Sequence, residues 1–314
     1  MQFRTQIPIH KSDFPIDYNS KIMAFGSCFV ENMGNKFDYF KFQNTVNPFG
    51  IIFNPVSIEK LIQRCIDKEY FTEKDIFFHN DLWHCYEVHS ELSNPNKEEF
   101  LKKLNFLIDS TNSQITESTH VIITLGTSWV YRNIKSNEIV ANCHKVPQKE
   151  FNKELLSIET IEKSIQNTIE LIQKVNPNCT FIFTISPVRH IKDGFVENNV
   201  SKAHLISAIH STYNLKPITY FPSYEIMMDE LRDYRFYDED MLHPSQVAID
   251  YIWVRFFENY ITEEIHSVMK EVCGIQKALK HRSFNPESEK HQKFLDTLEK
   301  KKEGLTQRFP QIKF

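Results

Sequence analysis

Two short segments, far apart in the sequence, carry the residue types of a hydrolytic site. The first contains Ser27, which follows a short apolar run, residues 21–26, that ends in a glycine. In an open α/β sheet, ligands bind at the carboxyl ends of the strands, where a serine hydroxyl can face the crevice. Backbone N–H groups of a following helix can receive an oxyanion there. Ser27 is therefore a candidate nucleophile; the alternative is that it only caps the helix.

The second segment contains Asp240 and His243, just before Pro244. Proline favours the first position of a helix, so both side chains lie in the turn that precedes one. From such a turn they can project toward one site. The histidine can act as a general base, and the aspartate can accept from its other ring nitrogen and fix the tautomer. The alternative is that these residues only cap the helix.

Strand and helix patterns alternate along the chain. Near-continuous apolar runs predict strands that are buried on both faces of a parallel sheet. Apolar residues at three- and four-residue steps predict the helices between them. This alternation predicts an α/β protein with an open, doubly wound parallel sheet and right-handed crossovers. The predicted strands are residues 21–26, 119–126, 179–187 and 217–223, and the predicted helices are residues 158–172, 202–213 and 244–261.

The domain organisation follows from the segments that this pattern of strands and helices does not include. Residues 51–118 are too long for one crossover, so we interpret them as a helical insertion over the sheet edge and a candidate lid. Within them, residues 77–92 are rich in His, Trp and Tyr and are interpreted as a hairpin or a cap. The sequence thus predicts a catalytic domain over residues 1–262 and a charged helical extension over residues 263–314. That extension is also a candidate surface for homo-oligomer formation.

The composition excludes several classes of protein. The 314 residues carry a net charge of −4, so no basic excess supports a nucleic-acid partner. No apolar stretch has the length of a membrane span, and the N-terminus lacks the apolar core of a signal peptide. These features predict a cytoplasmic protein with no membrane partner. The six cysteines are scattered without a C-x-x-C pair, so neither a zinc ribbon nor a disulfide framework is expected.

Several ordered motifs resemble those of a known family. Gly-Ser-Cys-Phe at residues 26–29, followed by Glu31 and Asn32, resembles the signature for which the GSCFA family is named. That family is related to the SGNH or GDSL hydrolases. The resemblance covers roughly residues 20–260. It continues through residues 47–50, 125–131, 186–190, 220–225 and 231–237.

The resemblance implies a fold and a catalytic triad. The fold is the three-layer, flavodoxin-like α/β sheet of SGNH hydrolases, and the triad is Ser27, His243 and Asp240. In that superfamily the oxyanion hole combines the N–H of the nucleophile with a glycine and an asparagine. Ser27 and Gly50 match the first two positions.

The third oxyanion position departs from the superfamily pattern. Ser128 stands where the asparagine is expected, in the sequence Gly-Thr-Ser-Trp at residues 126–129. Losing one such donor costs roughly 2.7–4 kcal/mol of transition-state stabilisation. Either Ser128 or Thr127 donates, or Asn142 substitutes from a loop, or catalysis is weak.

Further residues near the predicted strand ends are candidates for substrate binding. Arg189 and His190 follow a predicted strand and could bind an anionic or polar substrate; the alternative for Arg189 is an ion pair with Asp233. Lys202 is either a substrate contact or a helix-start residue. Cys28, beside Ser27, is interpreted as a packed thiol because neighbouring side chains point in different directions.

No metal or cofactor is predicted. His79, His84, His89 and His144 match no zinc signature in their spacing. The sequence also contains neither a Gly-x-Gly-x-x-Gly nor a Walker loop.

The predicted function is that of a serine hydrolase of the esterase or O-deacetylase type. Its expected substrate is a small-molecule or carbohydrate ester, and the carbohydrate rests on family analogy alone. Two alternatives remain. The same triad could transfer the acyl group to a hydroxyl acceptor, or the fold could be a non-catalytic binding module.

Overall fold

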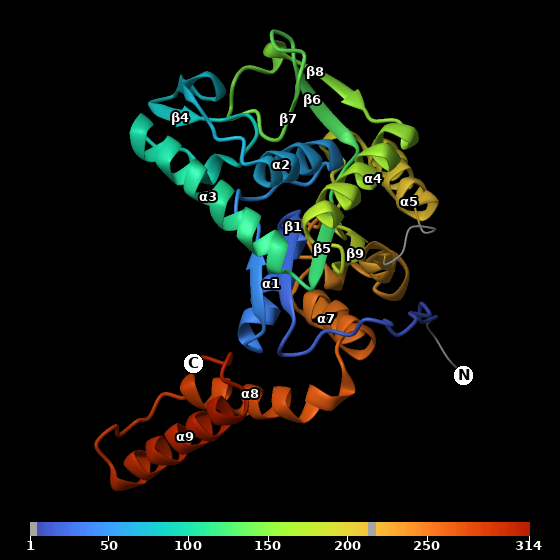
Figure 1. The fold of residues 1–314 in the computed structure, drawn as a ribbon. Coiled ribbons are helices and arrows are strands. Elements are labelled where there is room, and N and C mark those ends of the chain that lie inside the picture. The colour runs from blue at the N-terminus through green and yellow to red at the C-terminus, as the bar shows by residue number, and fades with distance from the viewer. Residues whose placement is uncertain (1–4, 213–217) are drawn as a thin grey trace.

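The computed structural model describes residues 5–212 and 218–314, with a five-stranded parallel sheet at its centre (Figure 1). The sheet order is β2-β1-β5-β9-β10, and every neighbouring pair is parallel. This confirms the predicted α/β parallel sheet. Residues 213 and 217, the ends of a predicted helix and a predicted strand, lie outside the described residues. The strands are β1 (Lys21–Gly26), β2 (Gln43–Val46), β5 (His120–Leu125), β9 (Thr180–Ile185) and β10 (Ile218–Phe221).

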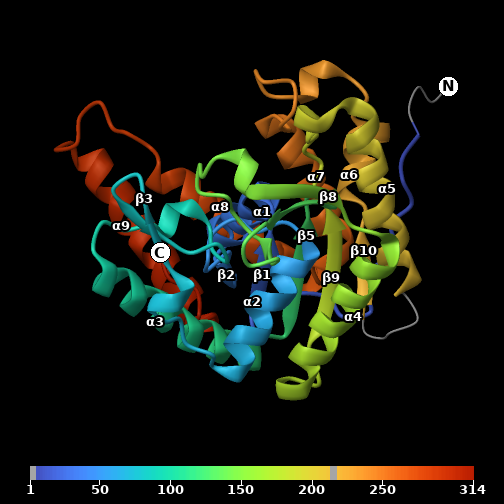
Figure 2. The same cartoon turned by 90° about the horizontal axis from the view of Figure 1, so that it is seen from above.

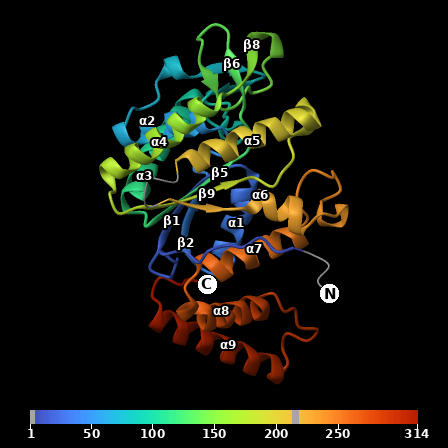
Figure 3. The same cartoon turned by 90° about the vertical axis from the view of Figure 1, so that its right-hand side faces the viewer.

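Helices cover both faces of the sheet, as Figure 3 shows. Alternate strand residues serve the two sides: Met23 and Phe25 of β1 join one core cluster, and Ile22 and Ala24 join the other. The first face is covered by α2 (Pro55–Asp67), α3 (Lys97–Glu117), α4 (Ile158–Val175) and α5 (Phe195–Ser211). The opposite face is covered by α1 (Cys28–Tyr39) and α7 (Gln246–Tyr260).

Residues 51–118 contribute to this cover rather than forming an insertion over the sheet edge. Their helices α2 and α3 supply buried residues to the core cluster of the first face. The physical reason is that both helices are amphipathic and bury their apolar stripe on the sheet. The hairpin β3 (Phe77–His79) and β4 (Leu82–His84) lies within the segment interpreted as a hairpin or cap.

A small antiparallel sheet stands on the same side of the molecule as α2 (Figure 1, Figure 2). It is formed by the residues between β5 and α4, and the sequence did not predict it. A hydrogen bond from the Ala141 N–H to the Tyr86 carbonyl, 2.8 Å long, joins it to the segment after β4. Its strands are β6 (Trp129–Asn133), β7 (Ile139–Val140) and β8 (Phe151–Leu155).

The C-terminal segment forms two helices, α8 (His266–Leu279) and α9 (Glu289–Arg308), beyond α7 (Figure 3). The side chain of Gln276 donates to the Tyr39 carbonyl at 2.9 Å, and the rings of Tyr18 and Phe309 lie 5.5 Å apart. These contacts dock the pair on the α1 side of the domain. Among the described residues, no helix combines the length and apolar character needed to cross a bilayer.

Candidate active site

Ser27 lies between β1 and α1 at the carboxyl edge of the sheet. Its N–H donates to the Thr124 carbonyl at 3.1 Å, which extends the β1–β5 ladder by one residue. Its Oγ accepts from the Phe29 N–H at 3.3 Å, so Ser27 is the N-cap of α1. The strand order reverses between β1 and β5, and such a switch point is where open α/β sheets bind ligands. Ser27 thus caps α1 at this edge of the sheet, and its role as a nucleophile stays a prediction.

The turn before Ser27 depends on Gly26. Its φ is +139°, and a Cβ built there would lie 2.2 Å from the Thr124 carbonyl oxygen. Only glycine fits such a position. Asn47 holds the same turn: its Oδ1 accepts from the Gly26 N–H at 2.8 Å, and its own N–H donates to Ala24. Asn47 therefore positions the turn before Ser27. The sequence did not predict this role, although residues 47–50 belong to the motifs that resemble the family.

Asp240 and His243 form the predicted pair on the loop before α7. His243 Nδ1 lies 2.5 Å from Asp240 Oδ2, while Asp240 Oδ1 accepts from the N–H groups of Leu242 and His243. These hydrogen bonds, that from the His243 N–H foremost, lower the pKa of Asp240 to about 2. At neutral pH the carboxylate can only accept, so Nδ1 carries the ring proton and Nε2 is left to act as a base.

The segment after β9 ties this loop to the sheet. The Arg189 N–H donates to the Leu242 carbonyl at 3.3 Å, and its guanidinium donates to Met241 at 2.6 Å. The guanidinium also lies 4.4 Å from the ring centroid of Tyr237. Arg189 therefore holds the loop rather than pairing with an acid, and the predicted ion pair with Asp233 is wrong. The backbone N–H and the guanidinium each donate to one backbone carbonyl instead, and within the described residues the buried Nε of Arg189 has no hydrogen-bond partner.

His190 lies between the two halves of the site. Burial foremost, and then nearby Lys202 and His243, lower its pKa to about 3. Its N–H donates to the Asn198 side chain at 2.8 Å, and its ring stacks on Phe53 with centroids 5.6 Å apart. Within the described residues its buried Nε2 has no partner. A neutral ring with one open nitrogen can contact a polar substrate, and the substrate-binding role of His190 stays a prediction.

Lys202 is buried in α5. Only 1% of its surface is exposed. Its Nζ donates to the carbonyls of Gly126 and Ser186 at 2.7 and 2.8 Å. It therefore joins the carboxyl ends of β5 and β9, and it stands within the helix rather than at its start.

The oxyanion donors implied by the resemblance are largely engaged elsewhere. The Gly50 N–H donates to the Asn47 carbonyl at 2.8 Å in a tight turn. The Ser128 hydroxyl is wholly buried and donates to the Ser201 carbonyl at 3.0 Å. The Asn142 side-chain oxygen accepts from the His144 N–H at 2.8 Å.

The prediction that Ser128 and Gly50 donate to the oxyanion is thus wrong. The Ser128 hydroxyl and the Gly50 N–H already donate to carbonyls within the protein. The N–H of Ser27 is also taken, by the Thr124 carbonyl. The first amides of a helix have no acceptor inside it. In α1, the Ser27 hydroxyl accepts from the Phe29 N–H.

Comparison with known families matches most of the chain. The model of the GSCFA family covers residues 21–256. The chain belongs to the GSCFA family. A second model, described as the C-terminal domain of GSCFA domain proteins, covers residues 272–314, which include α9 and most of α8. No curated protein matches the chain.

The histidines of the hairpin region of this GSCFA protein are structural. His84 Nδ1 lies 2.6 Å from Ser93 Oγ, and its Nε2 lies 2.9 Å from the His79 carbonyl. Burial lowers the pKa of His144 to about 4, so its ring is neutral at pH 7. Among the described residues no group of three His, Cys, Asp or Glu side chains could hold a metal ion.

Cys28, beside Ser27, behaves as a packed thiol. Burial, and then nearby Glu31, raise the pKa of its thiol, which favours the protonated form at neutral pH. A protonated thiol is a poor nucleophile, which leaves Ser27 as the candidate.

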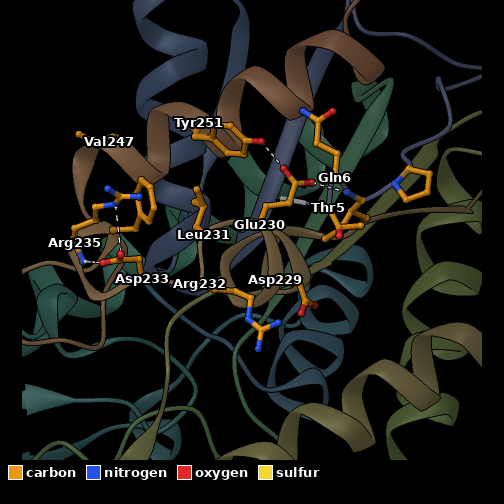
Figure 4. A pocket seen from close by; sticks show the side chains of 13 residues that line it. Thr5, Gln6, Asp229, Glu230, Leu231, Arg232, Asp233, Arg235, Val247 and Tyr251 are labelled. Atoms are coloured by element: carbon orange, nitrogen blue, oxygen red, sulfur yellow. Dashed lines mark hydrogen bonds and ion pairs between the residues drawn. The ribbon is translucent and has the colours of Figure 1, made fainter. Parts of the chain in front are cut away.

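A separate cavity of about 920 Å³ lies beside the loop that precedes α7 (Figure 4). The Glu230 side chain is buried at its wall, where it accepts from the Ile7 N–H at 2.7 Å and from the Tyr251 hydroxyl. Arg255 lies 3.5 Å from the same carboxylate. These polar groups contact one another and fasten the N-terminal arm.

Proposed function

We propose that this GSCFA protein is a serine esterase of the O-deacetylase type, related in fold and mechanism to the SGNH or GDSL hydrolases. Its substrate would be a small acyl ester, and the family analogy suggests the ester of a carbohydrate. The observation that carries the proposal is the preformed pair of Asp240 and His243 at the sheet edge that holds Ser27. Arg189 fastens the loop of that pair to the end of β9.

The reaction would proceed through an acyl-enzyme. Ser27 Oγ attacks the ester carbonyl while His243 Nε2 takes the hydroxyl proton, and Asp240 holds the resulting imidazolium. The tetrahedral intermediate collapses, and His243 returns the proton to the departing alcohol. Water then attacks the acyl-serine with His243 again as base. Ser27 regains its proton as the carboxylic acid leaves.

Geometry favours this chemistry at α1. The developing oxyanion would lie at the N-terminus of that helix, where the first backbone N–H groups and the helix dipole favour negative charge. No hydrogen bond joins Ser27 to His243 in the described part of the chain, and catalytic hydrogen bonds often tighten only when substrate binds.

A binding module without catalysis is the second candidate. It is favoured by one observation: the N–H groups of Ser27 and Gly50 already donate within the protein. The experiment below separates the two.

The test is labelling with a fluorophosphonate serine probe, with the modified peptide mapped by mass spectrometry alongside turnover of acetate esters. We expect the label on Ser27, its loss in Ser27→Ala, and a loss on the order of 10³-fold or more in His243→Ala. Ser157→Ala is the matched control, because Ser157 caps α4 through the Thr160 N–H at 3.2 Å. It loses a comparable cap, about 1 kcal/mol, and should label normally. An unlabelled wild-type protein with no turnover would support the binding module instead.

A further inference from the structure

Lys202 is a buried cation without a counter-ion. Its ammonium is surrounded by protein, with 1% of the residue exposed, and two carbonyl oxygens accept two of its three protons. Among the described residues no carboxylate forms an ion pair with it. Burying an unpaired ammonium carries a large desolvation cost, so such groups persist where the charge has a use.

None of the groups that face Lys202 forms an ion pair with it among the described residues. Burial raises the pKa of the Cys28 thiol on α1, and burial also raises the pKa of Glu225, in the short helix α6 (Ser223–Glu225). The Glu225 carboxylate in turn accepts from the Tyr220 hydroxyl at 2.7 Å. Tyr224 presents its ring face, with the centroid 5.2 Å from Nζ. His190 is neutral because its pKa is about 3.

Backbone contacts place the ammonium at the sheet edge that carries the candidate nucleophile. Nζ contacts the Gly126 carbonyl, two residues beyond Thr124, which accepts from the Ser27 N–H. Ser27 follows β1 and Gly126 follows β5, and these two strands are neighbours in the sheet. The mutual electrostatic influence of Lys202 and Cys28 is consistent with this placement.

We propose that Lys202 is the anion-binding group of the site, and that its ammonium stabilises the oxyanion formed when Ser27 attacks the ester carbonyl. It thus takes the role of the side-chain amide that the chain lacks at Ser128. The inference rests on the proposed esterase function. No proton is transferred in this step: the ammonium contributes its third N–H and its charge to the carbonyl oxygen as that oxygen becomes negative.

The proposal has a consequence for pH. Burial lowers the pKa of Lys202 to about 7, while Cys28 and Glu225 act in the opposite direction. The ammonium is therefore charged below about pH 7 and loses its charge above it. Oxyanion stabilisation by Lys202 should fall as the pH rises through that value, so kcat should decline above about pH 7. We call this decline the alkaline limb of the pH–rate profile.

The test compares wild type with Lys202→Met and Lys202→Gln over pH 5.5–9, with acetate-ester turnover as the readout. Methionine removes both the charge and the hydrogen bonds at similar length, whereas glutamine keeps N–H donors for the carbonyls of Gly126 and Ser186. We expect both variants to lose about 10²–10³-fold in kcat, the usual cost of one oxyanion donor, and to lack the alkaline limb. Lys60→Met, which removes a lysine bound to Glu138 at 2.7 Å, should keep that limb.

Several results would overturn the proposal. If Lys202→Gln keeps the wild-type kcat, Lys202 has only the structural role of joining the ends of β5 and β9. An alkaline limb that persists in both variants would assign it to another group. Should both variants fail to fold, a wild-type profile without an alkaline limb still contradicts the proposal. Labelling of Ser27 in wild type by the fluorophosphonate tests the esterase function separately, so the two failures can be told apart.

Discussion

The nucleophile side of the candidate site is buried and the base side is exposed. Ser27 and Lys202 have 2% and 1% of their surface exposed, whereas the side chains of Asp240 and His243 keep 46% and 49%. The first pair is held by contacts to neighbouring strands, as in the hydrogen bond from Ser27 to Thr124.

The second pair is held mainly by itself. Hydrogen bonds join the Asp240 side chain to Leu242 and His243, so residues within the loop hold His243 in position. Arg189 fastens it to the sheet. Substitutions on the buried side should therefore cost stability as well as activity, whereas substitutions on the exposed side should cost activity alone.

The largest effect is expected from Asp240→Asn. An amide at this position no longer enforces the tautomer of His243 that keeps Nε2 basic, so kcat should fall by roughly 10³–10⁴-fold. Because the pKa of Asp240 is lowered to about 2, the carboxylate stays charged and its contribution to stability is lost only as pH falls from about 4 through that value. The loss in kcat should thus appear at every pH from 5 to 9. Asp238→Asn is the matched control on the same loop, and an equal loss there would contradict the assignment.

Gly26→Ala should have the next largest effect, on stability. The new Cβ would lie 2.2 Å from the Thr124 carbonyl oxygen, at a φ of +139°. Overpacking and backbone strain together should cost about 3 kcal/mol or more in the free energy of unfolding. The control is Gly304→Ala in α9, where an added Cβ meets nothing within 4 Å. It should raise stability by about 0.5–1 kcal/mol, and urea unfolding measures both.

The same contrast explains what the sequence predicts well. Apolar runs mark strands that are buried on both faces, so residues 21–26 correspond to β1 without a shift. The pairing of Asp240 with His243 depends on residues three apart, which lie side by side in any turn. By contrast, β2 is a half-buried edge strand with the sequence Gln-Asn-Thr-Val and has no apolar run to reveal it.

The residues whose partners the sequence did not predict make contacts between distant segments of the chain. Ser128 donates to Ser201, 73 residues away, and Lys202 reaches carbonyls that follow two different strands. A lysine in a helical pattern is normally solvent-exposed, so its burial follows only from the packing of α5. Hydrogen-bond partners at such separations cannot be derived from spacing alone.

The smallest effect is expected from Arg189→Lys, which tests how far the exposed loop depends on the sheet. Lysine keeps the charge but loses the planar group that lies over Tyr237 while donating to the Met241 carbonyl. We expect kcat and the rate of Ser27 labelling to fall together by about tenfold, because His243 is less often in place. The free energy of unfolding should change by less than about 1 kcal/mol.

Arg235→Lys is the control for that substitution. The Arg235 side chain is 73% exposed and its Nε lies 3.7 Å from Asp233, so neither rate should change. If Arg189→Lys also stays within twofold of wild type, the loop does not need its tether. The hydrogen bonds within residues 240–243 would then suffice to present His243, and the division between a buried scaffold and a self-contained loop would be sharper than proposed. A fall in stability equal to that of Gly26→Ala would instead make Arg189 part of the scaffold.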